Sequence, residues 1–128
     1  MNEKILAFIR ECGFFFYATT EGDQPHVRPL GYIDEIDGKL VISISTVKPM
    51  AKQTLANPKF EICASTQGKW MRICGKALPI TDMAVLNKMY EHPVLHKNAP
   101  SAEAVGGFTL EIEHAACWSL AGEHFVLK

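Results

Sequence analysis

The chain has 128 residues, 48% of them hydrophobic, and thirteen basic residues nearly balance fourteen acidic ones to give a formal net charge of -1. This length suits one domain with a core of its own, and the hydrophobic content excludes an intrinsically disordered chain. The small net charge excludes a general attraction to nucleic acid or to anionic membranes, so a bound anion must be held by a local cluster of cations.

No apolar run approaches the length of a membrane span, and charged residues interrupt the first apolar stretch too soon for a signal peptide. We therefore expect a single domain, residues 1–128, in the cytoplasm. The four cysteines form no CxxC pair, and none lies near a histidine at zinc-finger spacing. Reduced, mostly buried thiols and no metal site are expected from this pattern.

Helical spacing of apolar residues predicts a first helix over 3–12, which Gly13 ends. Pro49 fits the first turn of a second helix, and the residue before Pro58 ends it. A third helix begins after Asp82 and closes at His92. Residues 93–105 have an irregular pattern that could include a short helical turn.

Alternating and β-branched residues predict the strands. They are expected over 14–20, 26–33, 39–46, 59–65, 70–78, 108–113, 116–120 and 123–127. Turn signals such as Asp37-Gly38 join most of them as hairpins, which favours an antiparallel sheet in an α+β fold with one barrel or curled sheet. A Rossmann fold is not supported, because GxGxxG and a βαβ series are both missing.

The stretch HVRPLGY, residues 26–32, is an unusual strand because a proline follows an arginine in its middle. An extended backbone would point His26, Arg28, Leu30 and Tyr32 to one face. Pro29 cannot donate to a strand ladder, so it belongs at an edge, a bulge or a barrel mouth. Such an irregularity leaves neighbouring backbone groups free to meet a ligand.

A second candidate site begins where the strand over 39–46 runs into a helix. Hydroxyl groups of Ser45 and Thr46 are followed by Lys48, Lys52 and Gln53. Helix N–H groups and mobile ammonium groups suit a phosphate, although solvated lysines beside a Ser/Thr cap would give the same pattern. No serine lies in a GxSxG elbow, so the pattern does not predict a hydrolase triad.

The segments GDQPHVRPLGY, GKLVISISTVKPMAKQTLANPKFEICA and GKWMRICGKA occur in an order that resembles a known superfamily. They are similar to the FMN-binding split-barrel proteins of the pyridoxamine 5'-phosphate oxidase-like superfamily, in particular to its small bacterial nitroimidazole-resistance-type branch. The resemblance is best over residues 5 to 80. It implies a six-stranded antiparallel split β-barrel flanked by short helices, and a homodimer with FMN at the subunit interface.

The resemblance also implies a set of cofactor contacts. Arg28 would contact the FMN phosphate or ribityl chain, and Pro29 and Leu30 would meet the flavin ring through their backbone. Ser45, Thr46, Lys48, Lys52 and Gln53 would surround the ribityl chain and phosphate, with Lys48 or Lys52 replacing a basic residue that relatives carry where Met50 stands. Lys69 and Trp70 would approach the ring, and Trp118 would reach a flavin bound mainly by the other subunit.

The implied function is an FMN-dependent oxidoreductase that transfers electrons or hydride to or from a small molecule, with nitro compounds or flavins as candidate substrates. A flavin-binding module for storage or electron carriage is an alternative that uses the same residues. Haem with His26 or His114 as an axial ligand is a further one. Pyridoxamine phosphate oxidase activity is not expected, because the chain ends at Lys128 without most of the arginine- and histidine-rich segment of that enzyme.

Overall fold

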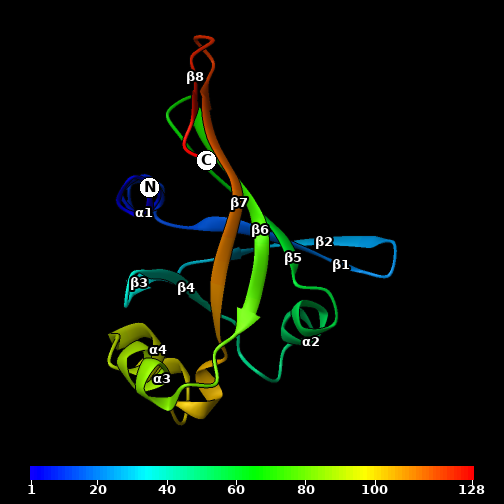
Figure 1. Cartoon of the computed structure of the whole chain (residues 1–128), viewed down its shortest axis with the longest axis vertical. Coiled ribbons are helices and arrows are strands. Elements are labelled where there is room, and N and C mark those ends of the chain that lie inside the picture. The colour runs from blue at the N-terminus through cyan, green and yellow to red at the C-terminus, as the bar shows by residue number, and fades with distance from the viewer.

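The computed structural model describes residues 1–128 and contains one eight-stranded antiparallel sheet (Figure 1). The strands are β1 Phe15–Glu21, β2 Gln24–Leu30, β3 Ile33–Ile36, β4 Lys39–Ser43, β5 Lys59–Thr66, β6 Lys69–Pro79, β7 Gly107–Ser119 and β8 His124–Val126. They follow the order β2-β1-β5-β6-β7-β4-β3, and β8 pairs with β7. The end strands β2 and β3 do not pair, so the curled sheet is not closed. This confirms the predicted α+β, mainly antiparallel fold.

Four short helices and one 3-10 turn flank the sheet. They are α1 Asn2–Cys12, α2 Pro49–Ala56, α3 Met83–Tyr90, α4 Pro93–Asn98 and the 3-10 turn η1 Glu103–Val105. None of them is long and apolar enough to cross a membrane. Gly13 ends α1 with a φ of 89°, a conformation that glycine adopts without strain.

The interior consists of two hydrophobic clusters. The larger one, of 21 buried residues, lies between the sheet, α1 and α2 and includes Tyr17 and Met50. The smaller one lies under α3 and α4 and includes Tyr32 and Met89. Tyr17 packs its ring parallel to that of Phe60, with the two centroids 5.7 Å apart.

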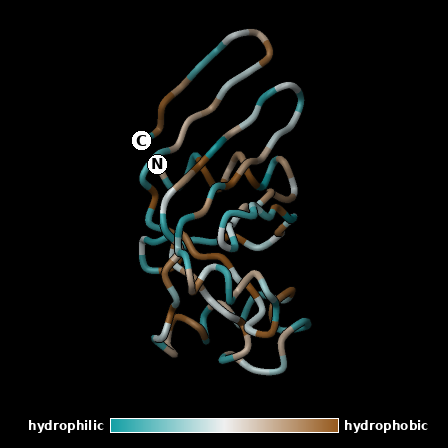
Figure 2. The backbone as a smooth tube through the Cα atoms, turned by 90° about the vertical axis from the view of Figure 1, so that its right-hand side faces the viewer, coloured by the Kyte–Doolittle hydropathy of each residue, from teal (hydrophilic) through white to brown (hydrophobic).

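One end of the sheet projects from this body as an arm, which we define as residues 65–71 and 116–126. Figure 2 shows the β5–β6 turn and the β7–β8 hairpin extending beyond the rest of the chain. The β7–β8 turn carries the strongly exposed Leu120. At the base of the arm, a side-chain Cβ on Gly75 would collide with the carbonyl oxygen of Glu111, so the close approach of β6 and β7 requires glycine here.

The sheet differs from the expected one in several details. It has eight strands, as many as the residue patterns predict, rather than the six that the resemblance implies, and the expected strand over 39–46 ends at Ser43. The strands expected over 108–113 and 116–120 are one strand, β7. The pairing of β6 with β7 shifts register between Cys74 and Gly75, and β7 continues through this irregularity.

Residues 93–105, expected to be irregular, contain α4 and η1. The cysteines are free thiols, as expected, but they are half-buried rather than mostly buried.

Candidate functional site

The side chain of Arg28 is held in place by two buried polar groups. Its Nη1 donates to Thr19 Oγ1 at 2.8 Å, and its Nη2 donates to Gln53 Oε1 at 2.9 Å. Thr19 also donates to Gln53 Oε1 at 2.8 Å, so the three side chains form a closed triangle. Thr19 and Gln53 are only 3% and 6% exposed. We call these three residues the inner cluster.

Strand pairing and helix docking build the inner cluster. Arg28 on β2 stands opposite Tyr17 on β1, and Thr19 stands opposite His26, so all four side chains share the core-facing side of the hairpin. Helix α2 packs over this side and brings Gln53 to them. The Tyr17 hydroxyl lies 3.4 Å from Thr54 Oγ1 on the same helix. Burial raises the pKa of Tyr17, and the Thr54 hydrogen bond and the Arg28 charge partly offset that rise.

The inner cluster leaves a positive charge available. Arg28 forms no ion pair with any carboxylate of the chain, and the two hydrogen bonds use two of the five N–H donors of its guanidinium group. The neighbouring His26 also has a buried Nε2 without a hydrogen-bond partner, 3.9 Å from the nearest carboxylate oxygen of Glu21. Unused donors at an oriented cation are what an anionic group such as a phosphate would need.

The start of α2 adds further positive groups. Lys48 is the N-cap residue of this helix, and no side chain caps its first N–H groups. Lys52, one turn later, is exposed like Lys48, and neither lysine forms an ion pair. Met50 is buried in the larger hydrophobic cluster, so its side chain does not present a group to an anion.

The two predicted hydroxyl residues before α2 have different surroundings. The backbone oxygen of Ser45 accepts a hydrogen bond from Lys48 N at 3.0 Å, which shapes the turn into the helix. Thr46 lines a separate cavity of about 150 Å³ together with Ala51 and Phe108. The structure therefore brings Arg28 and Gln53 into direct contact, whereas no hydrogen bond links them to Ser45 or Thr46.

The opposite face of the sheet presents apolar groups to solvent. Because directly opposed residues share a face, one row of neighbours runs across six strands. This row contains Pro29, Phe16, Cys63, Arg72, Ala116 and Val126. We call this side the outer face. Val27, Phe16 and Val126 are large exposed apolar side chains on it, and Val27 is 67% exposed.

Two of the predicted ring contacts of the arm, Trp70 and Trp118, also lie on the outer face. Trp70 stands opposite Trp118, and Trp118 stands opposite His124, so the three rings form a stack across β6, β7 and β8. The centroids are 6.3 Å and 5.2 Å apart, with interplanar angles of 15° and 10°. Lys69 is exposed at the start of β6, opposite Ser119. No hydrogen bond or aromatic contact joins this group to the inner cluster of the same chain.

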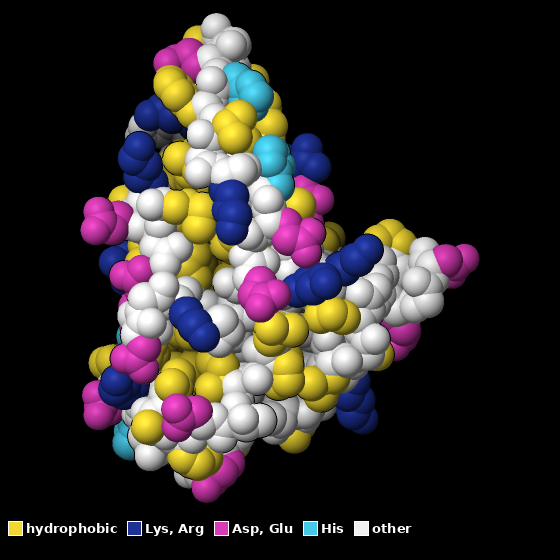
Figure 3. All heavy atoms as spheres, viewed as in Figure 1, with side chains coloured by type: hydrophobic (Ala, Val, Ile, Leu, Met, Phe, Trp, Pro, Cys, Tyr) yellow, Lys and Arg dark blue, Asp and Glu magenta, His cyan; other side chains and the backbone are white.

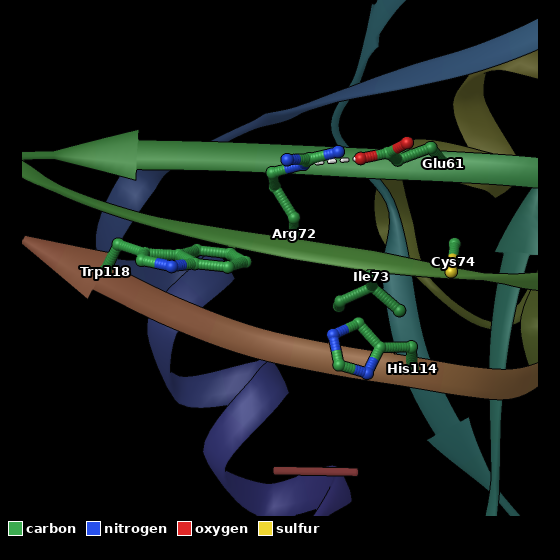
Figure 4. A pocket seen from close by; sticks show the side chains of 6 residues that line it. All are labelled: Glu61, Arg72, Ile73, Cys74, His114 and Trp118. Carbon is green, nitrogen blue, oxygen red and sulfur yellow. Dashed lines mark hydrogen bonds and ion pairs between the residues drawn. The ribbon is translucent and has the colours of Figure 1, made fainter. Parts of the chain in front are cut away.

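A cavity of about 230 Å³ lies beside this aromatic stack (Figure 4). Arg72 on β6 forms an ion pair with Glu61 on β5, and its guanidinium carbon lies 5.8 Å from the Trp118 ring centroid. Cys74 and His114, which face each other across β6 and β7, complete the polar lining. The hydrogen bond and charge of Glu61 raise the pKa of Arg72, and this cation, unlike Arg28, has a carboxylate partner within the chain.

The face of the molecule drawn in Figure 3 carries no large field of one sign. Figure 3 shows basic and acidic side chains interspersed on the visible face of the molecule. This distribution agrees with the net charge of -1 and makes local groups such as Arg28 decisive for anion binding.

One residue of the inner cluster was not predicted from the sequence, and one predicted neighbour of Arg28 lies elsewhere. Thr19 lies in an ordinary β-branched strand, and only its register opposite His26 brings it to Arg28. Tyr32 was expected on the same face as Arg28, but this expectation was wrong because β2 ends at Leu30. The connection that follows turns Tyr32 into the smaller cluster under α3 and α4.

The sequence of the chain matches a known protein family. A family model described as pyridoxamine 5'-phosphate oxidase matches residues 1–119. The chain belongs to the pyridoxamine 5'-phosphate oxidase family. Among curated proteins, none matches the chain.

Several solved structures share the fold of this chain. A NimC/NimA family protein from Clostridium acetobutylicum is 34% identical, with 98% of this chain and 92% of that chain covered at a TM-score of 0.82. The general stress protein 26 from Bacillus anthracis is 16% identical, with 98% and 97% covered at a TM-score of 0.73. A pyridoxamine 5'-phosphate oxidase-related, FMN-binding protein from Nostoc punctiforme is 15% identical, with 94% and 85% covered at a TM-score of 0.64.

Proposed function

We propose that two copies of this chain bind FMN at their interface and exchange electrons or hydride between the flavin and a small molecule. The observation that carries the proposal is Arg28, an oriented and half-buried cation that no carboxylate neutralises. Membership of a family that includes an FMN-binding protein supports the choice of ligand.

The inner cluster suits the phosphate end of FMN. Three N–H donors of Arg28 remain after its bonds to Thr19 and Gln53, and the unpaired Lys48 and Lys52 can approach from α2. Each charge-assisted hydrogen bond to a phosphate contributes about 1.5–3 kcal/mol. Ser45 and Thr46 would line the path from the phosphate to the ring.

The ring end requires a second copy of the chain. Pro29 and Leu30 lie on the terminal strand β2, where a flat ring can pack against exposed backbone. Lys69, Trp70 and Trp118 lie on the arm, with no hydrogen bond or aromatic contact to the inner cluster of their own chain, so they would reach the flavin held by the partner. The exposed apolar side chains of the outer face would become buried in such a dimer.

FMN, once bound, would supply the electron or hydride transfer itself, so the protein needs no nucleophile of its own. The residues of this chain would bind the phosphate, orient the ring and exclude water through Trp70 and Trp118. A protein that only binds and orients the flavin needs no catalytic triad or carboxylate pair, and the sequence indicates neither.

FMN titration followed by visible absorbance and by quenching of flavin fluorescence tests the proposal. Wild-type protein should bind FMN, and Arg28→Ala should weaken binding roughly tenfold to hundredfold, because one charge-assisted contact is lost. Lys88→Ala is the matched control, since it removes an exposed cation that pairs with Asp37 elsewhere. Protein that takes up no FMN, or an Arg28→Ala variant that binds as wild type does, would refute the site.

Turnover needs a separate assay. The FMN-loaded protein should oxidise NADH or NADPH in the presence of a nitro compound, a quinone or free flavin. Binding of FMN without turnover of any donor and acceptor pair would instead identify a storage or electron-carrying flavoprotein.

A further inference from the structure

Gln53 reaches the inner cluster from α2 and is only 6% exposed. Its Oε1 accepts hydrogen bonds from Thr19 Oγ1 at 2.8 Å and from Arg28 Nη2 at 2.9 Å. A guanidinium group carries donors and no acceptor, so the amide atom that faces Arg28 must be the oxygen. The orientation of the Gln53 amide group is therefore fixed, with its nitrogen Nε2 directed away from these two bonds.

The Nε2 end of Gln53 makes no hydrogen bond within the chain. In residues that are not exposed, only two polar side-chain atoms are both buried and without a partner, His26 Nε2 and the Tyr32 hydroxyl. Gln53 Nε2 is not one of them, so this atom has accessible surface although the rest of its side chain is buried. A nearly buried side chain thus presents two free N–H donors to a molecule outside the chain.

These free donors lie close to those of Arg28. The oxygen and the nitrogen of an amide group are about 2.3 Å apart, so Gln53 Nε2 lies within roughly 5 Å of Arg28 Nη2. Two oxygens of one phosphate group can bridge such a span, with one oxygen accepting from the guanidinium group and the other from the amide nitrogen.

Gln53 also holds Arg28 without cancelling its charge. Arg72 on the outer face provides the contrast, because the carboxylate of Glu61 holds it. A carboxylate at position 53 could accept the same two hydrogen bonds, but it would neutralise Arg28 and replace both Nε2 donors with an acceptor oxygen. A neutral amide at this position is therefore compatible with a bound anion, whereas a carboxylate opposes one.

We propose that Gln53 makes the inner cluster specific for a phosphomonoester. Its oxygen positions Arg28, its Nε2 donates to the phosphate, and its neutrality preserves the attraction between the cluster and an anion. This inference rests on the proposed function, in which the phosphomonoester is that of FMN. Riboflavin, the same flavin without the phosphate, should therefore bind much more weakly than FMN.

Flavin fluorescence titration with FMN and with riboflavin measures this specificity as the ratio of two dissociation constants. Wild-type protein should prefer FMN by roughly a hundredfold. Gln53→Glu should remove most of the preference, because it should weaken FMN binding by roughly that factor and leave riboflavin binding unchanged. Gln24→Glu is the matched control, since it makes the same change of charge at an exposed position of β2 and should keep the preference.

Gln53→Met separates the effect of charge from that of position. The variant leaves Arg28 charged but removes the oxygen acceptor and the Nε2 donors, so FMN binding should weaken roughly tenfold, less than in Gln53→Glu. If Gln53 only ties α2 to the β1–β2 hairpin, the order should be reversed, because Glu keeps both bonds of the tie and Met keeps neither. Urea unfolding at pH 7 checks that each variant is folded. Either folded variant decides the question alone, because an unchanged preference for FMN contradicts the inference.

Inorganic phosphate tests the inner cluster without flavin. Its addition to flavin-free wild-type protein should shift the NMR signals of the Gln53 side-chain amide, and Arg28→Ala should abolish that shift. Phosphate binding of this kind in protein that takes up no FMN would support the role of Gln53 and refute the flavin proposal. FMN binding without a preference over riboflavin, or with the preference intact in Gln53→Glu, would overturn the role of Gln53 and leave flavin binding itself intact.

Discussion

The inner cluster and the outer face differ in whether their side chains find partners within a single chain. On the inner side, Arg28, Thr19 and Gln53 satisfy one another under α2 and leave only surplus donors. On the outer side, Phe16 and Val27 remain exposed, although apolar side chains gain by burial. The inner cluster is therefore organised before any ligand arrives, whereas the outer face gains its packing only from a second molecule.

Mutations in the two regions should therefore have different effects. Substitutions in the inner cluster should lower the stability of the single chain, because they leave buried polar groups without partners. Substitutions on the outer face should leave the single chain nearly unchanged and alter assembly instead.

Thr19→Val should have the largest effect on stability. The substitution keeps the shape and strand preference of the residue. It removes the hydroxyl that accepts a hydrogen bond from Arg28 and donates one to Gln53. We expect a loss of about 1–3 kcal/mol in the free energy of unfolding, measured by urea denaturation at pH 7. Thr109→Val is the matched control, because Thr109 lies on β7 and its hydroxyl makes no hydrogen bond within the chain. Equal losses in the two variants would contradict the role assigned to the inner cluster.

The fold was largely predictable from the sequence, because hairpin signals such as Asp37-Gly38 fix which neighbours pair. Residues Asp37 and Gly38 adopt φ values of 52° and 79° in the structure, as a tight hairpin turn requires. The inner cluster was only partly predictable. Arg28 and Gln53 were candidates, but the contact of Arg28 with Thr19 depends on the β1–β2 register and on the docking of α2, which local patterns do not encode.

Tyr32 shows where a period-two pattern fails. Alternation along residues 26–32 places Tyr32 on the same face as Arg28 only if the strand continues to Tyr32. Strand β2 ends at Leu30, so the alternation does not extend to Tyr32. The aromatic stack depends on register in the same way. Trp70 and Trp118 were predicted separately as ring contacts, and only the β6–β7 register, which neither segment's pattern indicates, places them directly opposite each other.

Val27→Lys tests the outer face. The side chain is mostly exposed on the terminal strand, so the free energy of unfolding of the monomer should change by less than about 0.5 kcal/mol. Analytical ultracentrifugation should show that the wild-type chain forms dimers and that the variant dissociates at protein concentrations at least tenfold higher. Val94→Lys on α4, an exposed valine away from the outer face, should leave the dimer intact. Monomeric wild-type protein would remove the second half of the proposed flavin site.

The smallest expected effect at neutral pH is that of Tyr17, whose contribution changes with pH. Burial raises the pKa of its hydroxyl, so the folded state holds this proton more tightly than the unfolded state does. The corresponding stability is fully present below pH 10, the ordinary value for tyrosine, and is lost as the pH rises above it. Burial likewise raises the pKa of the thiols of Cys63 and Cys117, so their contribution begins to decline above pH 9.

Tyr17→Phe isolates the tyrosine part of this decline. At pH 7 the variant should lose less than about 1 kcal/mol, because the hydroxyl makes one weak contact with Thr54. Above pH 10 its stability should fall less steeply than that of wild type, by up to about 1.4 kcal/mol per pH unit, the slope for one proton. Urea unfolding at pH 7, 9 and 10.5 would measure the difference. Parallel curves for the two proteins would mean that the Tyr17 hydroxyl ionises as easily in the folded chain as in the unfolded one, and that the inner side of the hairpin is open to water.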